Sequence, residues 1–196
     1  LSPADLPIMI FGLDTWLETV LFDEDRAVDF MQALIPYFVS RVNAFFDAGA
    51  FAVILPVPFA NPNIITNHIL HDVVLPILHE AFGLVNGALI LHSGGAVLAP
   101  FLNALKDLPN VGAFVVNGKD DFKLARQKAG PNATLIGNIE GPGLVYRTPE
   151  DIRREIEILL ESCRDDLHFI PGTSGADIAL ETPLENILAL RKAVEA

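Results

Sequence analysis

The chain has 196 residues, of which 51% are apolar and only 19% charged, so it can bury a core and does not have the composition of a disordered segment. Thirteen basic against 25 acidic side chains give a net charge of −12, which argues against nucleic acid and anionic membrane surfaces as partners. The apolar runs are strand-sized, well short of the roughly 20 residues that span a membrane, and the single cysteine cannot form an internal disulfide. We therefore expect a cytoplasmic protein without membrane spans.

The first elements are a short apolar run and a long helix. We interpret Ile8 to Phe11 as a short strand. The helix begins at an acidic cluster, Asp23, Glu24 and Asp25, and its apolar residues recur at helical spacing: Met31, Leu34, Ile35, Phe38, Val42, Phe45 and Phe46. The next residues, Ala48 to Ala50, end it.

Strands and helices then alternate along the chain. The expected strands are Phe51 to Leu55, Ala88 to Leu91, Ala113 to Val116, Thr134 to Ile136 and His168 to Ile170. Their uninterrupted apolar character is typical of strands buried on both faces, and the intervening segments are long enough for helices. This βα alternation indicates an α/β fold around a parallel sheet, within a single domain covering 1–196.

With Ile8 to Phe11 included, the pattern gives six βα units, whereas a closed (β/α)8 barrel needs eight. An open arc would expose apolar side chains and two unpaired edges. Either a partner covers them or a preceding segment is absent, and the chain begins with Leu1 rather than Met. We expect a fragment.

Two helix starts are well marked. Thr148-Pro149-Glu150-Asp151 and Thr182-Pro183-Leu184-Glu185 each place a capping threonine before a proline, with an acid at the third position. Cys163 lies on the apolar face of the first of these helices and is expected in the core. His68, His71 and His79 share another predicted helix, where we expect a structural or solvated role.

Three segments together resemble the uroporphyrinogen decarboxylase superfamily. They are Asn61 to Leu78 (NPNIITNHILHDVVLPIL), Leu91 to Gly95 (LHSGG), and Ile136 to Ile187, which begins IGNIEGPG and ends TPLENI. They follow one continuous order over nearly the whole chain. The resemblance implies a (β/α)8 TIM barrel of which this chain is the C-terminal two-thirds.

Within the superfamily, the loop Pro58 to Pro62 looks more like that of the methylcobamide:coenzyme M methyltransferases than that of the decarboxylases. That branch implies a methylcobalamin or corrinoid cofactor carried by a partner corrinoid protein, and a small-molecule methyl donor or acceptor. Self-association is left open. The arginine-rich signature of the decarboxylases and their histidine in the last strand-to-helix loop are not found in this chain.

His92 ends a predicted strand and would lie at the barrel mouth, where active sites are built. In the methyltransferases the resemblance implies a zinc bound by His-x-Cys and a second cysteine in the final loop. Those cysteine positions correspond here to Gly94 and to Thr173 or its neighbours, so zinc is not expected. A weaker site from His92, Glu140 and a residue outside the chain is the alternative.

Asn138 and Glu140 follow a predicted strand, and Glu140 occupies a place where the family often has an acid. At the mouth this carboxylate would act as a general base or bind substrate, with loop bracing as the alternative. Asn117 stands where a family Asp is common. We assign catalytic roles to His92, Asn138 and Glu140.

Two small-residue loops complete the predicted mouth. Ser93-Gly94-Gly95 and Gly172-Thr173-Ser174-Gly175 could present backbone N–H groups to an anion, with plain turn geometry as the alternative. With Asn117 they form the predicted substrate-binding set: Ser93, Gly94, Gly95, Asn117, Thr173 and Ser174.

Three functions follow. The leading hypothesis is methyl transfer to or from a corrinoid cobalt, with an acceptor or donor other than a simple thiol, such as a methoxylated or methylamine-like compound. Decarboxylation of an acidic tetrapyrrole is the alternative enzyme activity, but this acidic chain supplies few cations to hold carboxylates. The third is a degenerate barrel that binds a ligand or protein without catalysis.

Overall fold

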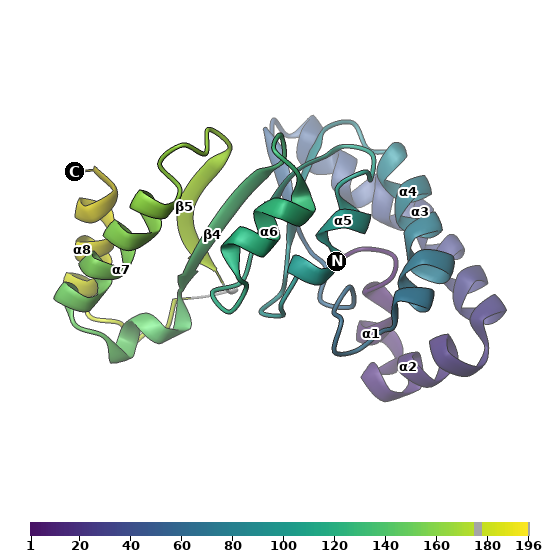
Figure 1. Cartoon of the computed structure of the whole chain (residues 1–196). Helices are drawn as coiled ribbons and strands as arrows, with labels where there is room; N and C mark the ends of the chain where they lie inside the picture. The colour runs from purple at the N-terminus through teal and green to yellow at the C-terminus, as the bar shows by residue number, and fades with distance from the viewer. Residues whose placement is uncertain (175–177, 196) are drawn as a thin grey trace.

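A computed structural model describes residues 1–174 and 178–195, and its framework is one parallel sheet (Figure 1). Five strands pair in chain order: β1 (Ala52–Pro56), β2 (Ala88–His92), β3 (Val111–Val115), β4 (Thr134–Glu140) and β5 (Phe169–Ser174). Every neighbouring pair is parallel. The carboxyl ends of the strands therefore lie along one edge of the sheet, toward the bottom of Figure 1.

A helical segment follows each strand, as parallel pairing requires and as the alternation predicts. These segments are the π-helix η1 (Ile69–Val74) with α4 (Leu75–Gly83), the 3₁₀-helix η2 (Ala99–Phe101) with α5 (Leu102–Leu105), α6 (Phe122–Ala129), the 3₁₀-helix η3 (Pro142–Tyr146) with α7 (Pro149–Ser162), and α8 (Leu184–Glu195). The predicted strands are confirmed with shifted ends. The largest shifts are at the ends of β4 and β5: β4 continues to Glu140 rather than ending at Ile136, and β5 continues to Ser174 rather than ending at Ile170.

The strand predicted at Ile8 to Phe11 is wrong, because this run forms the helix α1 (Leu6–Phe11). Pro7 lies in its first turn, where backbone N–H groups have no partner within the helix, so the N–H that proline lacks costs no hydrogen bond. Gly12 follows at a φ of 82°. A four-residue apolar run is too short to show a helical or strand period, so only the flanking residues could have distinguished the two. The described residues thus form five βα units rather than six.

Two more helices precede the sheet: α2 (Leu13–Phe22) and α3 (Glu24–Asp47). The second is the predicted long amphipathic helix. Its buried residues repeat at helical spacing: Ala27, Met31, Ile35, Phe38 and Val42. Asp23 caps it by accepting a hydrogen bond from the Arg26 amide at 3.4 Å. Among the described residues no helix has both the length and the apolar character needed to cross a membrane.

The two predicted helix starts differ in their hydrogen bonds. Thr148 and Asp151 form a complete capping box, in which each side chain accepts from the other residue's backbone N–H at 3.2 Å. The other helix, α8, begins at Leu184, close to the prediction. However, the buried hydroxyl of Thr182 has no hydrogen-bond partner among the described residues, so it does not act as the expected cap.

The core lies between the sheet and its helices. The larger cluster runs from Trp16 of α2 across Phe59, Phe82 and Phe114, and a smaller one joins β4 and η3 to α7 and α8. The smaller cluster consists of Ile139, Leu144, Ile152, Ile156, Ala189 and Ala193. Cys163 at the end of α7 is buried, which confirms its predicted place in the core.

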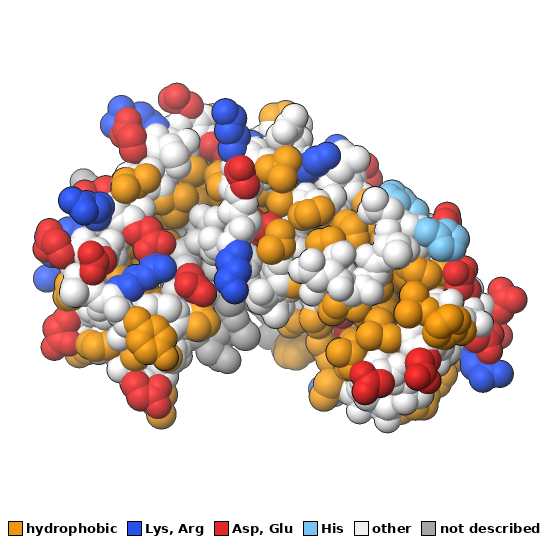
Figure 2. All heavy atoms as spheres, turned by 60° about the horizontal axis from the view of Figure 1, so that its bottom comes forward, with side chains coloured by type: hydrophobic (Ala, Val, Ile, Leu, Met, Phe, Trp, Pro, Cys, Tyr) orange, Lys and Arg blue, Asp and Glu red, His pale blue; other side chains and the backbone are white. Residues whose placement is uncertain are grey.

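Apolar surface is exposed at both edges of the sheet. Ile54 on edge strand β1 is 58% exposed and Ile170 on edge strand β5 is 49% exposed. Phe22 of α2 is exposed as well, and apolar side chains gather over α1 and α2 at the lower right of Figure 2. This is the exposure expected of an open arc of strands. That a preceding segment completes the barrel stays a prediction.

Candidate functional site

His92 is the last residue of β2, as predicted, and pairs with Pro56 on one side and Val115 on the other. Its Nδ1 accepts a hydrogen bond from the Gly94 amide at 2.9 Å. This bond favours the neutral tautomer with the proton on Nε2 and holds the ring against the turn that follows.

The turn itself needs glycine. Gly94 has a φ of 64° and Gly95 a φ of 92°, and a Cβ on Gly94 would lie 3.1 Å from the Cβ of Pro58. Because the Gly94 N–H already donates to His92, it is occupied within the protein. These contacts favour the plain-turn interpretation of this loop over an anion-binding one. Ser93 beside it is buried, and its hydroxyl has no partner among the described residues.

A buried carboxylate that sequence reasoning missed braces the loops after β2 and β3. Asp120 is 5% exposed. Its carboxylate accepts hydrogen bonds from the amides of Leu98, Ala99 and Asn117 at 2.9 to 3.2 Å. These donors belong to two separate segments, so Asp120 joins the start of η2 to the end of β3. The signal was hidden because an Asp in a loop sequence resembles any turn residue.

Asn138, predicted to be catalytic, contributes its amide to the same bracing. Its Nδ2 donates to the carbonyls of Asp120 at 3.1 Å and Asn117 at 3.3 Å. Asn117 is itself buried, and its Oδ1 accepts from the Lys119 amide at 2.9 Å. These contacts favour the loop-bracing alternative for both asparagines, and a direct role in catalysis stays a prediction.

The predicted loop from Gly172 to Gly175 is mostly strand, since β5 continues to Ser174, and Gly175 lies outside the described residues. Ser174 is 1% exposed, and its Oγ accepts from the Gly118 amide at 2.7 Å and donates to the Ile139 carbonyl at 3.2 Å. Thr173 pairs with Ile139 in the sheet. The strand continues beyond the predicted end because β4 and β5 pair over six residues.

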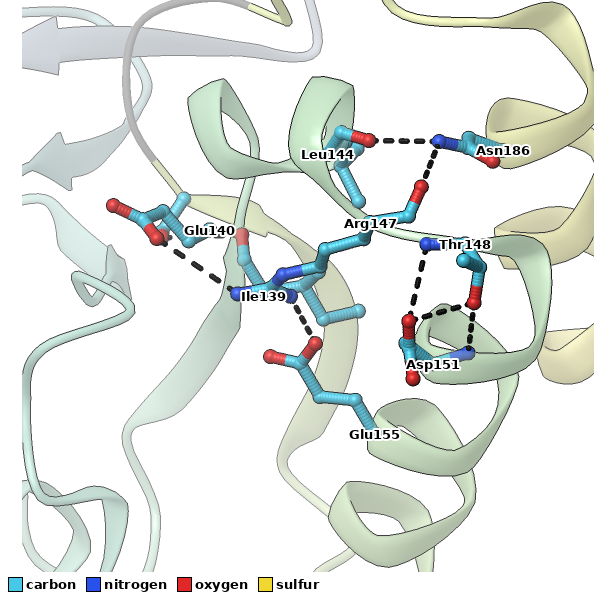
Figure 3. A network of polar contacts seen from close by, with 9 residues as sticks. Ile139, Glu140, Leu144, Arg147, Thr148, Asp151, Glu155 and Asn186 are labelled. Atoms are coloured by element: carbon cyan, nitrogen blue, oxygen red, sulfur yellow. Dashed lines mark hydrogen bonds and ion pairs between the residues drawn. The ribbon is translucent and has the colours of Figure 1, made fainter.

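Glu140 ends β4, and its half-exposed side chain is held by Arg147 (Figure 3). Arg147 Nη2 lies 3.8 Å from Glu140 Oε2, while Nη1 pairs closely with Glu155 of α7. Arg147 did not figure in the predicted site, because nothing in its spacing distinguishes it from other surface arginines.

His92 and Glu140 lie at different heights on the sheet. His92 pairs with Val115 of β3, and Val115 pairs with Ile136 of β4. Glu140 therefore lies four residues further along β4 than the residue level with His92. At about 3.3 Å per residue, this separates them by roughly 13 Å along the strands, and they are two strands apart. The weak metal site from these two residues is therefore not supported. Within 1–174 and 178–195, no three His, Cys, Asp or Glu residues are placed to hold a metal ion.

The described residues also do not fit a thiolate-bound zinc. Cys163 is the only thiol of the chain, and burial raises its pKa, which disfavours the thiolate that zinc requires. It precedes β5, whereas His92 ends β2, so the two lie at opposite ends of the parallel strands. We derive no chemical step through zinc, and its absence from the protein stays a prediction.

A hollow of about 760 Å³ lies away from the mouth, between α6 and the end of α7. Arg126 and Asp166 line it and pair at 2.7 and 3.0 Å, and Arg126 also donates to the carbonyls of Gly130 and Ala133. These contacts tie the amino ends of β4 and β5 together. We assign this arginine a structural role.

A family model, uroporphyrinogen decarboxylase (URO-D), matches residues 1–196. The chain belongs to the uroporphyrinogen decarboxylase family. It is 31% identical over 153 residues to a methylcobamide:CoM methyltransferase, MtaA, of Methanosarcina barkeri, and 30% identical over 153 residues to MtaA of M. barkeri strain Fusaro / DSM 804. Each match covers 78% of this chain and 43% of the relative, so the matched part spans less than half the length of these relatives.

Solved structures confirm the fold of this family member. A methyltransferase from Methanosarcina mazei superposes with a TM-score of 0.83 at 23% identity, over 99% of this chain and 56% of that one. A putative vitamin-B12 independent methionine synthase from Listeria monocytogenes gives a TM-score of 0.56 at 16% identity, over 89% of this chain and 55% of that one. The family match and these superpositions confirm the predicted TIM-barrel class, and the identity to MtaA confirms the resemblance to the methyltransferase branch.

Proposed function

We propose that this uroporphyrinogen decarboxylase family member is part of a methyltransferase that moves a methyl group between a small molecule and a corrinoid held by a partner protein. The observation that carries the proposal is the 31% identity to a methylcobamide:CoM methyltransferase over 78% of the chain. The substrate and the corrinoid partner belong to this proposal.

The chain's own residues would orient the acceptor and handle its proton. When bound, the corrinoid would supply the methyl group on its cobalt. His92 and Glu140 are the two titratable side chains predicted for the mouth. Glu140 could accept the proton that a protic acceptor loses on methylation, whereas His92, whose Nδ1 already accepts from Gly94, could donate a hydrogen bond from Nε2. The loops around them are held by Asp120, Asn138 and Ser174, so the acceptor would meet a surface already in place.

Tetrapyrrole decarboxylation is less well supported. It requires cationic groups to hold several carboxylates. Of the described residues that follow β3 and β4, Lys119 and Arg147 are the cations nearest the strand ends, and Arg147 is already paired with Glu155 and Glu140. The described part of the mouth therefore offers little free positive charge.

The test uses the full-length protein with methylcobalamin, both free and bound to a corrinoid protein. Coenzyme M, a methylamine and a methoxylated aromatic compound would be offered as acceptor or donor. We expect the corrinoid absorption spectrum to change with at least one of them, while uroporphyrinogen loses no carboxylate. If no compound changes the spectrum and no tetrapyrrole is consumed, a binding barrel without catalysis replaces the proposal.

Variants test the site. His92→Ala and Glu140→Ala should each slow the spectral change by about 10- to 1000-fold if they position or deprotonate the acceptor. His79→Ala and Glu150→Ala remove the same side chains from exposed helical positions and serve as matched controls. If neither His92→Ala nor Glu140→Ala slows the reaction more than its control, the site assignment is wrong while the family assignment stands.

A further inference from the structure

Arg147 stands between two carboxylates that belong to different elements. It follows η3 and precedes α7, and its side chain is 26% exposed. Nη1 pairs closely with Glu155 of α7, and Nη2 lies 3.8 Å from Oε2 of Glu140 at the end of β4 (Figure 3). The guanidinium thus has one tight partner on a helix and one looser partner at the strand end.

The backbone of Arg147 is held as firmly as its side chain. Asn186 of α8 is 2% exposed, and its Nδ2 donates to the carbonyls of Leu144 and Arg147, each at 2.8 Å. The next residue, Thr148, is fixed by its capping box with Asp151. Hydrogen bonds from α7 and α8 therefore place the guanidinium before any substrate arrives.

Two glycines leave space for the Glu140 side chain. A Cβ on Gly143 would lie 2.8 Å from Glu140 Oε2, and a Cβ on Gly118 would lie 3.1 Å from Glu140 Cβ. A larger residue at Gly143 would displace the carboxylate, and one at Gly118 would press on the base of the side chain. The carboxylate thus lies between the Gly143 backbone and a guanidinium, while Gly118 packs against the Cβ of Glu140.

We infer that Arg147 is a positioning residue, which holds the Glu140 carboxylate in place for the substrate, with Glu155 anchoring the guanidinium from the other side. This inference rests on the proposed function, because it takes Glu140 to face the reacting molecule. The loose 3.8 Å contact orients Glu140 but leaves its oxygens able to accept a hydrogen bond from a substrate. Arg147 acts through Glu140 and does not itself touch the reacting atoms.

The first experiment does not depend on activity. In the full-length protein, the side-chain Nε–Hε NMR signal of Arg147 is assigned by its loss in Arg147→Lys. Glu155→Gln should move this signal strongly and Glu140→Gln should also move it, whereas Glu150→Gln, which removes the partner of Arg153, should leave it unchanged. If the Arg147 signal does not move in Glu140→Gln, the inference is overturned, whatever reaction the protein performs.

The second experiment measures methyl transfer from methylcobalamin with the acceptor found active above. Arg147→Met should lower kcat by roughly 10- to 100-fold, the effect of a misplaced catalytic group, with little change in KM. Arg147→Lys should recover part of the rate, and the control Arg153→Met should keep the wild-type rate. In the Glu140→Gln background, Arg147→Met should slow the reaction no further, because its target is already gone.

Additive losses in the double variant would show that Arg147 acts independently of Glu140 and would overturn the inference. A wild-type protein inactive with every compound tested would refute the proposed function instead. In that case the NMR result alone decides whether Arg147 holds Glu140.

Discussion

Asp120 should contribute more to stability than a typical loop aspartate, because its carboxylate is the acceptor for three buried amides. The donors are the N–H groups of Leu98, Ala99 and Asn117, and all three residues are buried. Replacing Asp120 by alanine leaves these donors without their acceptor. An unsatisfied buried donor costs about 1 to 3 kcal/mol, so even at the lower end of this range the three donors should make Asp120→Ala lower the free energy of unfolding by at least about 3 kcal/mol.

The adjacent Asp121 is a matched control. It is exposed and accepts one hydrogen bond, from the Leu124 amide at 3.0 Å, as the N-cap of α6. Loss of an N-cap typically costs about 1 kcal/mol, so Asp121→Ala should be clearly milder. Asp120→Asn, which keeps one side-chain oxygen, should fall between the two.

The measurement is urea unfolding of the full-length protein, together with amide hydrogen exchange of the wild type and each variant. Asp120→Ala should speed exchange at Leu98, Ala99 and Asn117, whereas Asp121→Ala should speed it at Leu124. Equal destabilisation by the two substitutions, or unchanged exchange at Leu98 and Ala99, would refute the bracing role of Asp120.

Three further predictions concern titration and metal content. Burial raises the pKa of Asp5 to about 6 from 3.8, so the stability that its protonated form contributes is present below about pH 4 and is lost as pH rises through about 6. Asp5→Asn should therefore gain up to roughly 3 kcal/mol over wild type between pH 4 and pH 8 in chemical unfolding, and a pH-independent difference would contradict this. Hydrogen bonds to Asp72 and then Glu24 raise the pKa of His68, so its contribution is full below about pH 6.5 and is lost as pH rises through the raised value. The difference in melting temperature between wild type and His68→Ala should accordingly shrink from pH 6 to pH 9. Elemental analysis should find no stoichiometric zinc bound through thiolate, and tight zinc that is lost in Cys163→Ser would overturn our ligand argument.

The fold class could be predicted from the sequence because its signals are local. Buried parallel strands are continuous apolar runs, and α3 shows its helical period over 24 residues. The capping box at Thr148 is complete within four residues. Each of these patterns depends on neighbours in the chain and needs no knowledge of the rest of the molecule. The order of the three family segments added the barrel type, and the family match confirms it.

The architecture of the mouth was decided only by the tertiary structure, because its contacts join distant segments. Gly118 donates to Ser174, 56 residues away, and Asp120 caps residues more than 20 positions earlier. The contacts of Arg147 also join distant segments: its side chain pairs with Glu140 and Glu155, and Asn186 donates to its carbonyl. A linear sequence shows which residues can donate and accept hydrogen bonds, but only the packing of β4, α7 and α8 determines which of them meet.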